Sequence, residues 1–290
     1  MKRLLFVDTN IFLDFYRVES DAALNLLVEL ESKKSDLIFT YKVDVEFKKN
    51  RQSVIHSGLK SMKTPDIQIT PPAFLKETKT LRVISTERKD IKDRIQDLHQ
   101  RIVRSISDPA MHDPVFQSFQ RLLKKPTSLF LAEDSVDRRK IERVALRRFL
   151  AGYPPRKKDD TSIGDSINWE WMISCCKKES ANLVIVSRDS DFGCTLNGKS
   201  YVNDWLKNEY HSRLSRHHTI QLFDTLADGL RLFGVSAGKE VKKDEQAAAL
   251  KASDSDTAAT AAKVVQRILD APPGSSREII ESMIKDETGA

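Results

Sequence analysis

Short apolar segments that alternate with helical patterns are the feature that most constrains how this chain folds. Four segments have the length and composition of buried strands: Leu4–Val7, Asp36–Tyr41, Leu183–Val186 and Thr219–Phe223. Apolar residues recur with helical spacing in the intervening segments: Ile11–Tyr16, Ala22–Leu30, Val43–Ile55, Ser166–Cys176 and the residues from 224 to Leu232. Because strands that alternate with helices build a parallel sheet covered by helices, we predict an α/β fold.

Acidic residues follow two of these predicted strands. Asp8 comes directly after the first strand, and Asp189 and Asp191 follow the third. The binding crevice of a parallel sheet lies beyond the carboxyl ends of its strands, so both acidic segments point at the same edge. Glu46 begins the helix after the second strand, and Asp165 opens the helical segment before the third. The sequence therefore predicts five carboxylates near one edge of the sheet.

Such a group of carboxylates indicates a metal site. Like charges repel each other, and burying them without compensation is costly, whereas a divalent cation removes the conflict. Hard oxygen ligands suit Mg²⁺ or Mn²⁺, and these ions activate water in phosphodiester cleavage. Each acid alone also has a plainer interpretation, as a helix cap, a surface helix residue or a turn residue. The metal hypothesis therefore rests on the set and not on any single residue.

Charge and composition narrow the class of function. The formal net charge is +6 and the pI is about 9.1, which favours a polyanionic partner such as nucleic acid. The three cysteines indicate neither a disulfide framework nor a zinc site, and no apolar run is long enough to span a membrane. We therefore expect a cytoplasmic protein without a membrane partner. The chain has no phosphate loop, no dinucleotide-binding glycine pattern and no nucleophile elbow.

The chain divides into three predicted parts. Residues 1–235 form the α/β domain, within which residues 57–160 are a helical insertion rich in charged residues. The basic residues of the insertion suggest a nucleic-acid clamp, although a solvated helical hairpin explains them equally well. Residues 236–260 have the composition of a flexible linker, and residues 261–290 of a short helical tail. Whether that tail is a docking module or a frayed end stays open.

Four of these segments resemble the motifs of the PIN-domain nuclease family. They are Val7–Asn10, Glu46–Arg51, Gly164–Trp169 and Val186–Phe192. Within the family, the chain is most similar to the large branch with a helical insertion, which also shows an arginine after the first motif, here Arg17. The resemblance covers about residues 1–56 and 160–233. It implies a PIN-like parallel sheet covered by helices.

The resemblance also implies roles for individual residues. The metal-holding catalytic acids would be Asp8, Glu46, Asp165 and Asp189, with Asp191 as an auxiliary ligand or an acid behind the ligands. Asn10 would orient Asp8 or a metal-bound water, and Ser187 would stand where a threonine is more usual. The candidates for phosphate contact are Arg17, Arg51 and Arg188, although Arg51 fits an ion pair with an acid equally well. Cleavage by metal-activated water would leave a 5′-phosphate and a 3′-hydroxyl.

The implied function is a metal-dependent endoribonuclease. Many members of the family are toxins held by an antitoxin, or effectors of antiviral defence, so a regulatory protein partner fits the resemblance, as does a homodimer. Two alternatives are a DNA nuclease and a nucleic-acid-binding scaffold with little catalysis. A phosphatase with an aspartyl nucleophile fits less well, because it needs a second aspartate where this chain has Asn10.

Overall fold

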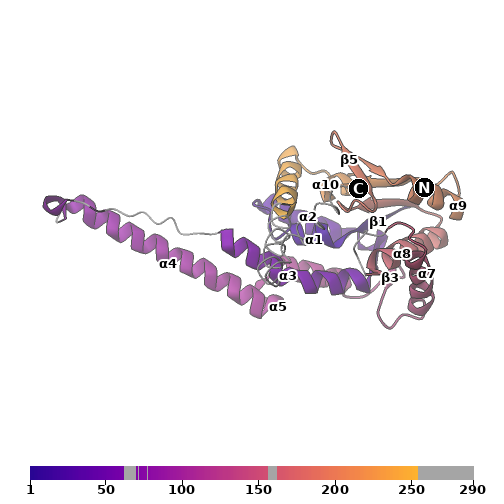
Figure 1. The fold of residues 1–290 in the computed structure, drawn as a ribbon, viewed down its shortest axis with the longest axis horizontal. Helices are drawn as coiled ribbons and strands as arrows, with labels where there is room; N and C mark the ends of the chain where they lie inside the picture. Colours follow the sequence, from indigo (N-terminus) through magenta and orange to yellow (C-terminus); the bar gives the residue numbers. More distant parts are fainter. Residues whose placement is uncertain (62–69, 71, 77, 156–161, 254–290) are drawn as a thin grey trace, which may run out of the picture.

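Five parallel strands form one sheet, in the order β3-β2-β1-β4-β7 (Figure 1). The computed structural model describes residues 1–61, 70, 72–76, 78–155 and 162–253. The strands of the sheet are β1 (Arg3–Val7), β2 (Leu37–Thr40), β3 (Phe130–Leu131), β4 (Asn182–Val186) and β7 (Ile220–Phe223). Strand β1 lies at the centre, paired in parallel with β2 on one side and β4 on the other. This arrangement confirms the predicted α/β fold.

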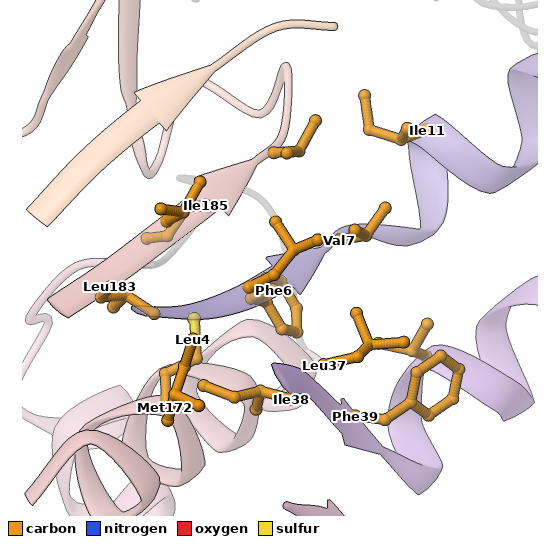
Figure 2. Packing of buried hydrophobic residues seen from close by; sticks show 14 of the residues in the cluster. Leu4, Phe6, Val7, Ile11, Leu37, Ile38, Phe39, Met172, Leu183 and Ile185 are labelled. Carbon is orange, nitrogen blue, oxygen red and sulfur yellow. The ribbon is translucent and has the colours of Figure 1, made fainter. Parts of the chain in front are cut away.

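Helices cover both faces of the sheet. They are α1 (Thr9–Asp14), α2 (Asp21–Ser32), α3 (Tyr41–Ser61), α4 (Lys79–Ser107), α5 (Pro109–His112), α6 (Pro114–Leu123), α7 (Arg138–Leu150), α8 (Gly164–Glu179), α9 (Asp204–Arg213) and α10 (Leu226–Arg231), with 3-10 turns η1 (Lys34–Asp36) and η2 (Ala73–Leu75). Met172 of α8 points at Leu4 on one face (Figure 2). Helix α10 packs on the opposite face at Gly229, where an added Cβ would lie 2.4 Å from Val186 Cγ2.

The predicted insertion over residues 57–160 is narrower in the structure. Helix α4 projects from the body of the molecule (Figure 1), and none of its residues is buried. The segment after α4 instead belongs to the core. Phe119 of α6 is fully buried and stacks on Phe47 of α3 with ring centroids 3.9 Å apart. Strand β3 extends the sheet beside β2. The projecting part therefore ends near Ser107, and the apolar residues after it pack in the core of the domain.

A hairpin also stands where no element was predicted. Strands β5 (Gly193–Leu196) and β6 (Lys199–Val202) pair in antiparallel fashion between β4 and α9. At Gly193, with φ +156°, a Cβ would lie 1.9 Å from the carbonyl oxygen of Tyr201. The close approach of the two strands therefore requires glycine at this position.

The flexible linker predicted over residues 236–260 is wrong for residues 239–253, which form a helix. Two acids fix this helix to the domain. Asp244 accepts hydrogen bonds from the backbone N–H groups of Glu19 and Ser20, at 3.0 Å and 2.8 Å. Glu245 is buried and accepts from the backbone N–H groups of Leu226 and Ala227, at 2.8 Å and 3.0 Å. The tail predicted over residues 261–290 lies outside the described residues.

Docking of the 239–253 helix should weaken as the pH rises. Burial raises the pKa of Glu245 from 4.5 to about 7. The folded state therefore holds the proton more tightly than the unfolded state, so stability is lost as the pH rises from about 4.5 through about 7. The shift corresponds to about 3 kcal/mol. We expect hydrogen exchange in residues 239–253 to speed up over this window.

The matched variant for this prediction is Glu245→Gln, which keeps a carbonyl acceptor for the α10 N–H groups and removes the titration. Its exchange rates, corrected for the intrinsic effect of pH, should stay level between pH 5 and pH 8. Equal pH dependence in the variant and the wild type would show that another group controls the docking of this helix.

No helix in the described part of the chain is long and apolar enough to cross a membrane. The three cysteines are free thiols, with Cys175 and Cys176 buried in α8 and Cys194 exposed on β5. Burial raises the pKa of the Cys176 thiol to about 12.

Candidate metal centre

The carboxyl ends of β1 and β4 lie side by side. The two strands are paired in register, with Val7 opposite Val186. The backbone N–H of Asp8 donates to the carbonyl of Val186 at 2.9 Å, which continues the ladder one residue beyond β1. The Ser187 hydroxyl then donates to Asp8 Oδ2 at 2.5 Å. The two acidic segments therefore meet at one edge of the sheet.

Asp8 is the most enclosed of the acids, with 5% of its surface exposed. It caps α1: its Oδ1 accepts from the backbone N–H of Thr9 at 2.7 Å, and its Oδ2 accepts from Asn10 Nδ2 at 2.8 Å. Burial raises the pKa of Asp8 to about 6, the hydrogen bond from Ser187 opposes this rise, and the charges of Glu46 and Asp189 add to it. Asp8 is thus both a helix cap and a member of a group of repelling carboxylates.

Glu46 reaches this group from α3. The helix begins directly after β2, and Glu46 lies in its second turn with an exposed side chain. Thr9 Oγ1 donates to Glu46 Oε2 at 3.1 Å. Thr9 follows Asp8 in sequence, so this bond holds the Glu46 carboxylate beside the Asp8 backbone. Glu46 therefore lies at the predicted edge.

Asp189 is placed by a tight turn after β4. Its backbone N–H donates to Ser187 Oγ at 3.0 Å, while its own Oδ1 accepts from the N–H of Asp191 at 3.2 Å. The turn closes with a hydrogen bond from the Phe192 N–H to the carbonyl of Asp189, at 3.1 Å. Ser187 consequently connects Asp8 with the backbone of Asp189, and Asp191 belongs to the same turn.

The start of α8, which carries Asp165, lies at the carboxyl end of β2. Asn168, one turn later on the helix, is buried, and its Oδ1 accepts from Thr40 Oγ1 at 2.5 Å. Thr40 is the last residue of β2, so the start of α8 lies at the carboxyl end of that strand. Ser166 Oγ donates to the carbonyl of Pro155 at 3.3 Å and fixes the first turn.

The donor set suits a hard cation. Within the described residues, no three acidic, histidine or cysteine side chains are already arranged around a single ion position. The four acids nevertheless offer only oxygen donors, which Mg²⁺ and Mn²⁺ prefer. In addition, Asn10 Oδ1 is buried and accepts no hydrogen bond from any described residue. A carbonyl oxygen of this kind is suited to a metal-bound water, in line with the role that the resemblance implied for Asn10.

Two of the three candidate arginines share one ion-pair partner, Asp14. Arg188 forms an ion pair with Asp14, and its Nη2 donates to the carbonyl of Asn10 at 3.5 Å. Arg17 pairs with the same Asp14 at 3.2 Å. Asp14 is buried, so it holds both guanidinium groups near the end of α1. Arg188 keeps 23% of its side chain exposed, next to the segment that carries Asn10.

Arg51 is placed differently. It is 3% exposed and lies 2.7 Å from Asp113 Oδ2, while Tyr16 Oη accepts from Arg51 Nε at 3.0 Å. The burial of this guanidinium favours the pairing with an acid over contact with phosphate. Nothing in the sequence identified Asp113 as the partner, because the two residues are 62 positions apart. Thr9 and Asn168, which the sequence interpretation did not single out, lie inside matched motifs.

Loss of the Ser187 hydroxyl should disturb both acids that it touches. Ser187→Ala removes the buried hydroxyl donor of Asp8 Oδ2, which keeps only its bond from Asn10 Nδ2, and leaves the Asp189 N–H without its acceptor. We expect the free energy of unfolding to fall by about 1–3 kcal/mol in urea titrations. Ser187→Thr keeps the hydroxyl and should lie within about 1 kcal/mol of wild type. Equal stability of the alanine and threonine variants would contradict the bridging role.

These features define a class of protein: a parallel α/β sheet with carboxylates gathered at the carboxyl ends of its central strands, a nuclease-type arrangement. A family model described as PIN domain matches residues 5–192, which is more than half of the chain. The chain belongs to the PIN domain family, whose members are generally metal-dependent nucleases. No curated protein and no solved structure matches the chain.

Proposed function

We propose that the chain is a metal-dependent endoribonuclease whose centre consists of Asp8, Glu46, Asp165 and Asp189, with Asp191 as an auxiliary acid. The observation that carries the proposal is Asp8. It is buried, its pKa is raised to about 6, and the charges of Glu46 and Asp189 contribute to that rise. The neighbouring charges disfavour the ionised Asp8 carboxylate in the metal-free fold, whereas a bound cation would favour it.

The chemistry that fits this centre is hydrolysis of a phosphodiester. Asp8, Glu46, Asp165 and Asp189 would hold the Mg²⁺ or Mn²⁺, which would supply an activated water and charge stabilisation at the leaving oxygen. Asn10 Nδ2 and the Ser187 hydroxyl both donate to Asp8 Oδ2, which holds this carboxylate in one orientation. Arg188 and Arg17 are available to contact phosphate oxygens on the side of Asp14. Attack of water on phosphorus breaks the bond to the 3′ oxygen and leaves a 5′-phosphate and a 3′-hydroxyl.

RNA is the proposed substrate because the resemblance favours it and the chain has a net charge of +6. A role as a toxin or as an effector of antiviral defence, with a regulatory protein partner and a cytoplasmic location, belongs to the same proposal. A scaffold with little catalysis is the second candidate. The intact acids favour the enzyme, since a chain that does not bind a cation has no use for carboxylates that repel one another.

The direct test is cleavage of end-labelled RNA and DNA, each single-stranded and structured, in Mg²⁺, in Mn²⁺ and in EDTA. We expect RNA to be cut with either ion and not in EDTA, and the products to be substrates for ligases that require a 5′-phosphate. Cleavage in EDTA would falsify the metal mechanism, and cleavage of DNA alone would overturn the choice of RNA. No cleavage together with no Mn²⁺ binding in calorimetry would support the scaffold.

A further inference from the structure

Two aromatic side chains lie together on the surface. Tyr153 follows α7 and Trp205 is the second residue of α9. Their ring centroids are 5.0 Å apart and the ring planes meet at 31°. Tyr153 is 46% exposed and Trp205 is 50% exposed. The two other tryptophans, Trp169 and Trp171, are buried, so Trp205 is the one whose indole is open to solvent.

Hydrogen bonds connect the segments of the aromatic pair to the neighbours of Asp165 and Asp191. On the Tyr153 side, the carbonyl of Pro155 accepts a hydrogen bond from Ser166, the residue after Asp165, at 3.3 Å. On the Trp205 side, the N–H of Asn203 donates to the carbonyl of Phe192, the residue after Asp191, at 2.8 Å. Tyr153 is thus two residues from Pro155, whose carbonyl is bonded to the neighbour of Asp165. Trp205 is two residues from Asn203, whose N–H is bonded to the neighbour of Asp191.

A buried network of charges connects the two segments that carry the rings. Arg148 donates to the carbonyl of Pro154, next to Tyr153, and forms ion pairs with Glu209 and Glu170. Glu209 lies one turn after Trp205 on α9. Arg148 and Glu170 are 6% and 3% exposed. The same side chain thus connects the segment of Tyr153 to the helix of Trp205.

We propose, on the basis of the nuclease function above, that Tyr153 and Trp205 form a stacking platform for an unpaired nucleobase of the substrate. Bases stack on exposed aromatic rings whatever their identity, because every base has a π face. In a duplex, both faces of a base are covered by its neighbours, so the platform selects single strands. The site accordingly takes single-stranded nucleic acid in preference to duplex.

Tryptophan fluorescence reports on this platform without any cleavage. The chain has three tryptophans, and a base that stacks on Trp205 quenches the exposed one. In EDTA, a ten-nucleotide single-stranded adenosine RNA should quench the emission, whereas inorganic polyphosphate of similar charge should not. Trp205→Phe should lose the quenching and keep the affinity, because phenylalanine retains a stacking face. Quenching that persists in Trp205→Phe would overturn the assignment to this ring.

Alanine variants measure the contribution to binding. Tyr153→Ala and Trp205→Ala should each weaken binding of the single strand roughly tenfold, as expected for the loss of one stacked base. Tyr153→Phe should restore the affinity. Binding of duplex RNA should change little. The matched control is Phe74→Ala, which removes an 81% exposed ring from η2, outside the acidic edge, and should bind like wild type. Wild-type affinity in folded alanine variants, checked by thermal unfolding, would overturn the platform.

The platform and the nuclease can fail separately. A chain that binds and is quenched but cuts no RNA keeps the platform and loses the proposed activity. A chain that cuts RNA equally well with and without the two rings keeps the activity and loses the platform. A parallel titration with a single-stranded DNA of the same length tells whether the base alone is recognised, in which case both strands quench alike.

Discussion

Asp8→Asn should abolish cleavage and leave the metal-free fold at least as stable as the wild type. The activity should fall by roughly a thousandfold or more, since a catalytic cation supplies several kcal/mol of transition-state stabilisation and Asp8 is the central acid of its proposed site. Loss of activity without loss of stability distinguishes a cation site from an ordinary helix cap. Replacing an Asp that serves only as a cap lowers the stability or leaves it unchanged, and it does not affect catalysis.

The effect on stability follows from the pKa of Asp8, which burial raises from 3.8 to about 6. The folded chain therefore loses stability relative to the unfolded chain as the pH rises from about 3.8 through about 6, by about 3 kcal/mol at most. The neutral amide removes that cost and keeps a carbonyl acceptor. The gain from the substitution should therefore be about 1–3 kcal/mol at pH 8 and should vanish near pH 4. Urea titrations in EDTA at the two pH values measure it.

Added metal should reverse the order of the two proteins. Mn²⁺ at a hundred times its dissociation constant stabilises the wild type by about 2.7 kcal/mol and should leave Asp8→Asn unchanged. The control is Asp97→Asn on the exposed surface of α4, which should match the wild type in cleavage, stability and response to Mn²⁺. An Asp8→Asn protein that is less stable than wild type in EDTA would assign the residue to capping alone.

Arg51→Ala should lower the free energy of unfolding by about 3–5 kcal/mol, the usual cost of breaking a buried ion pair from one side. The substitution leaves Asp113, 2% exposed, without its cation and next to the Tyr16 hydroxyl that donates to it at 2.7 Å. Asp113 also caps α6 by accepting from the Phe116 N–H at 2.9 Å. Urea denaturation measures the loss.

The variant also separates a structural role of Arg51 from contact with phosphate. Combining Arg51→Met with Asp113→Asn removes both charges and keeps a side chain that can cap α6, so the pair should recover part of the loss. Cleavage per folded molecule should stay near wild type in both proteins. The surface control is Arg94→Ala on α4, expected within about 0.5 kcal/mol of wild type. A folded, fully stable Arg51→Ala protein with weakened RNA binding would restore the phosphate role.

The parts of the fold that could be predicted depend on local patterns. Asp8 and Asp189 follow buried strands, and parallel pairing alone brings strand ends to one edge, so their placement needed no knowledge of the rest of the chain. Strand β3 contains two residues, Phe130 and Leu131. Two residues are too few to show the alternation of polar and apolar side chains from which a strand is predicted. It pairs only because β2 has a free edge beside it.

Other features depend on contacts between distant segments. Residues 239–253 have the alanine-rich, charged composition of a linker, and they dock because Glu245 meets the N–H groups at the start of α10. Arg51 finds Asp113 across 62 positions. Neither partner has a signal of its own in the sequence, and the same holds for the hydroxyl–amide contact of Thr40 with Asn168. The composition of a segment does not predict these contacts, because each one depends on two residues that lie far apart in the sequence.

The projecting helix α4 is connected at its base to the helix that carries Glu46. Its 29 residues give it a length of roughly 40 Å. Near its base, the carbonyl of Ser105 accepts a hydrogen bond from Arg51. Arg51 belongs to α3, the same rigid helix that presents Glu46 five residues earlier. A displacement of α4 at Ser105 would therefore reach Glu46, a carboxylate of the proposed metal site, through the Arg51 guanidinium and little more than one helical turn.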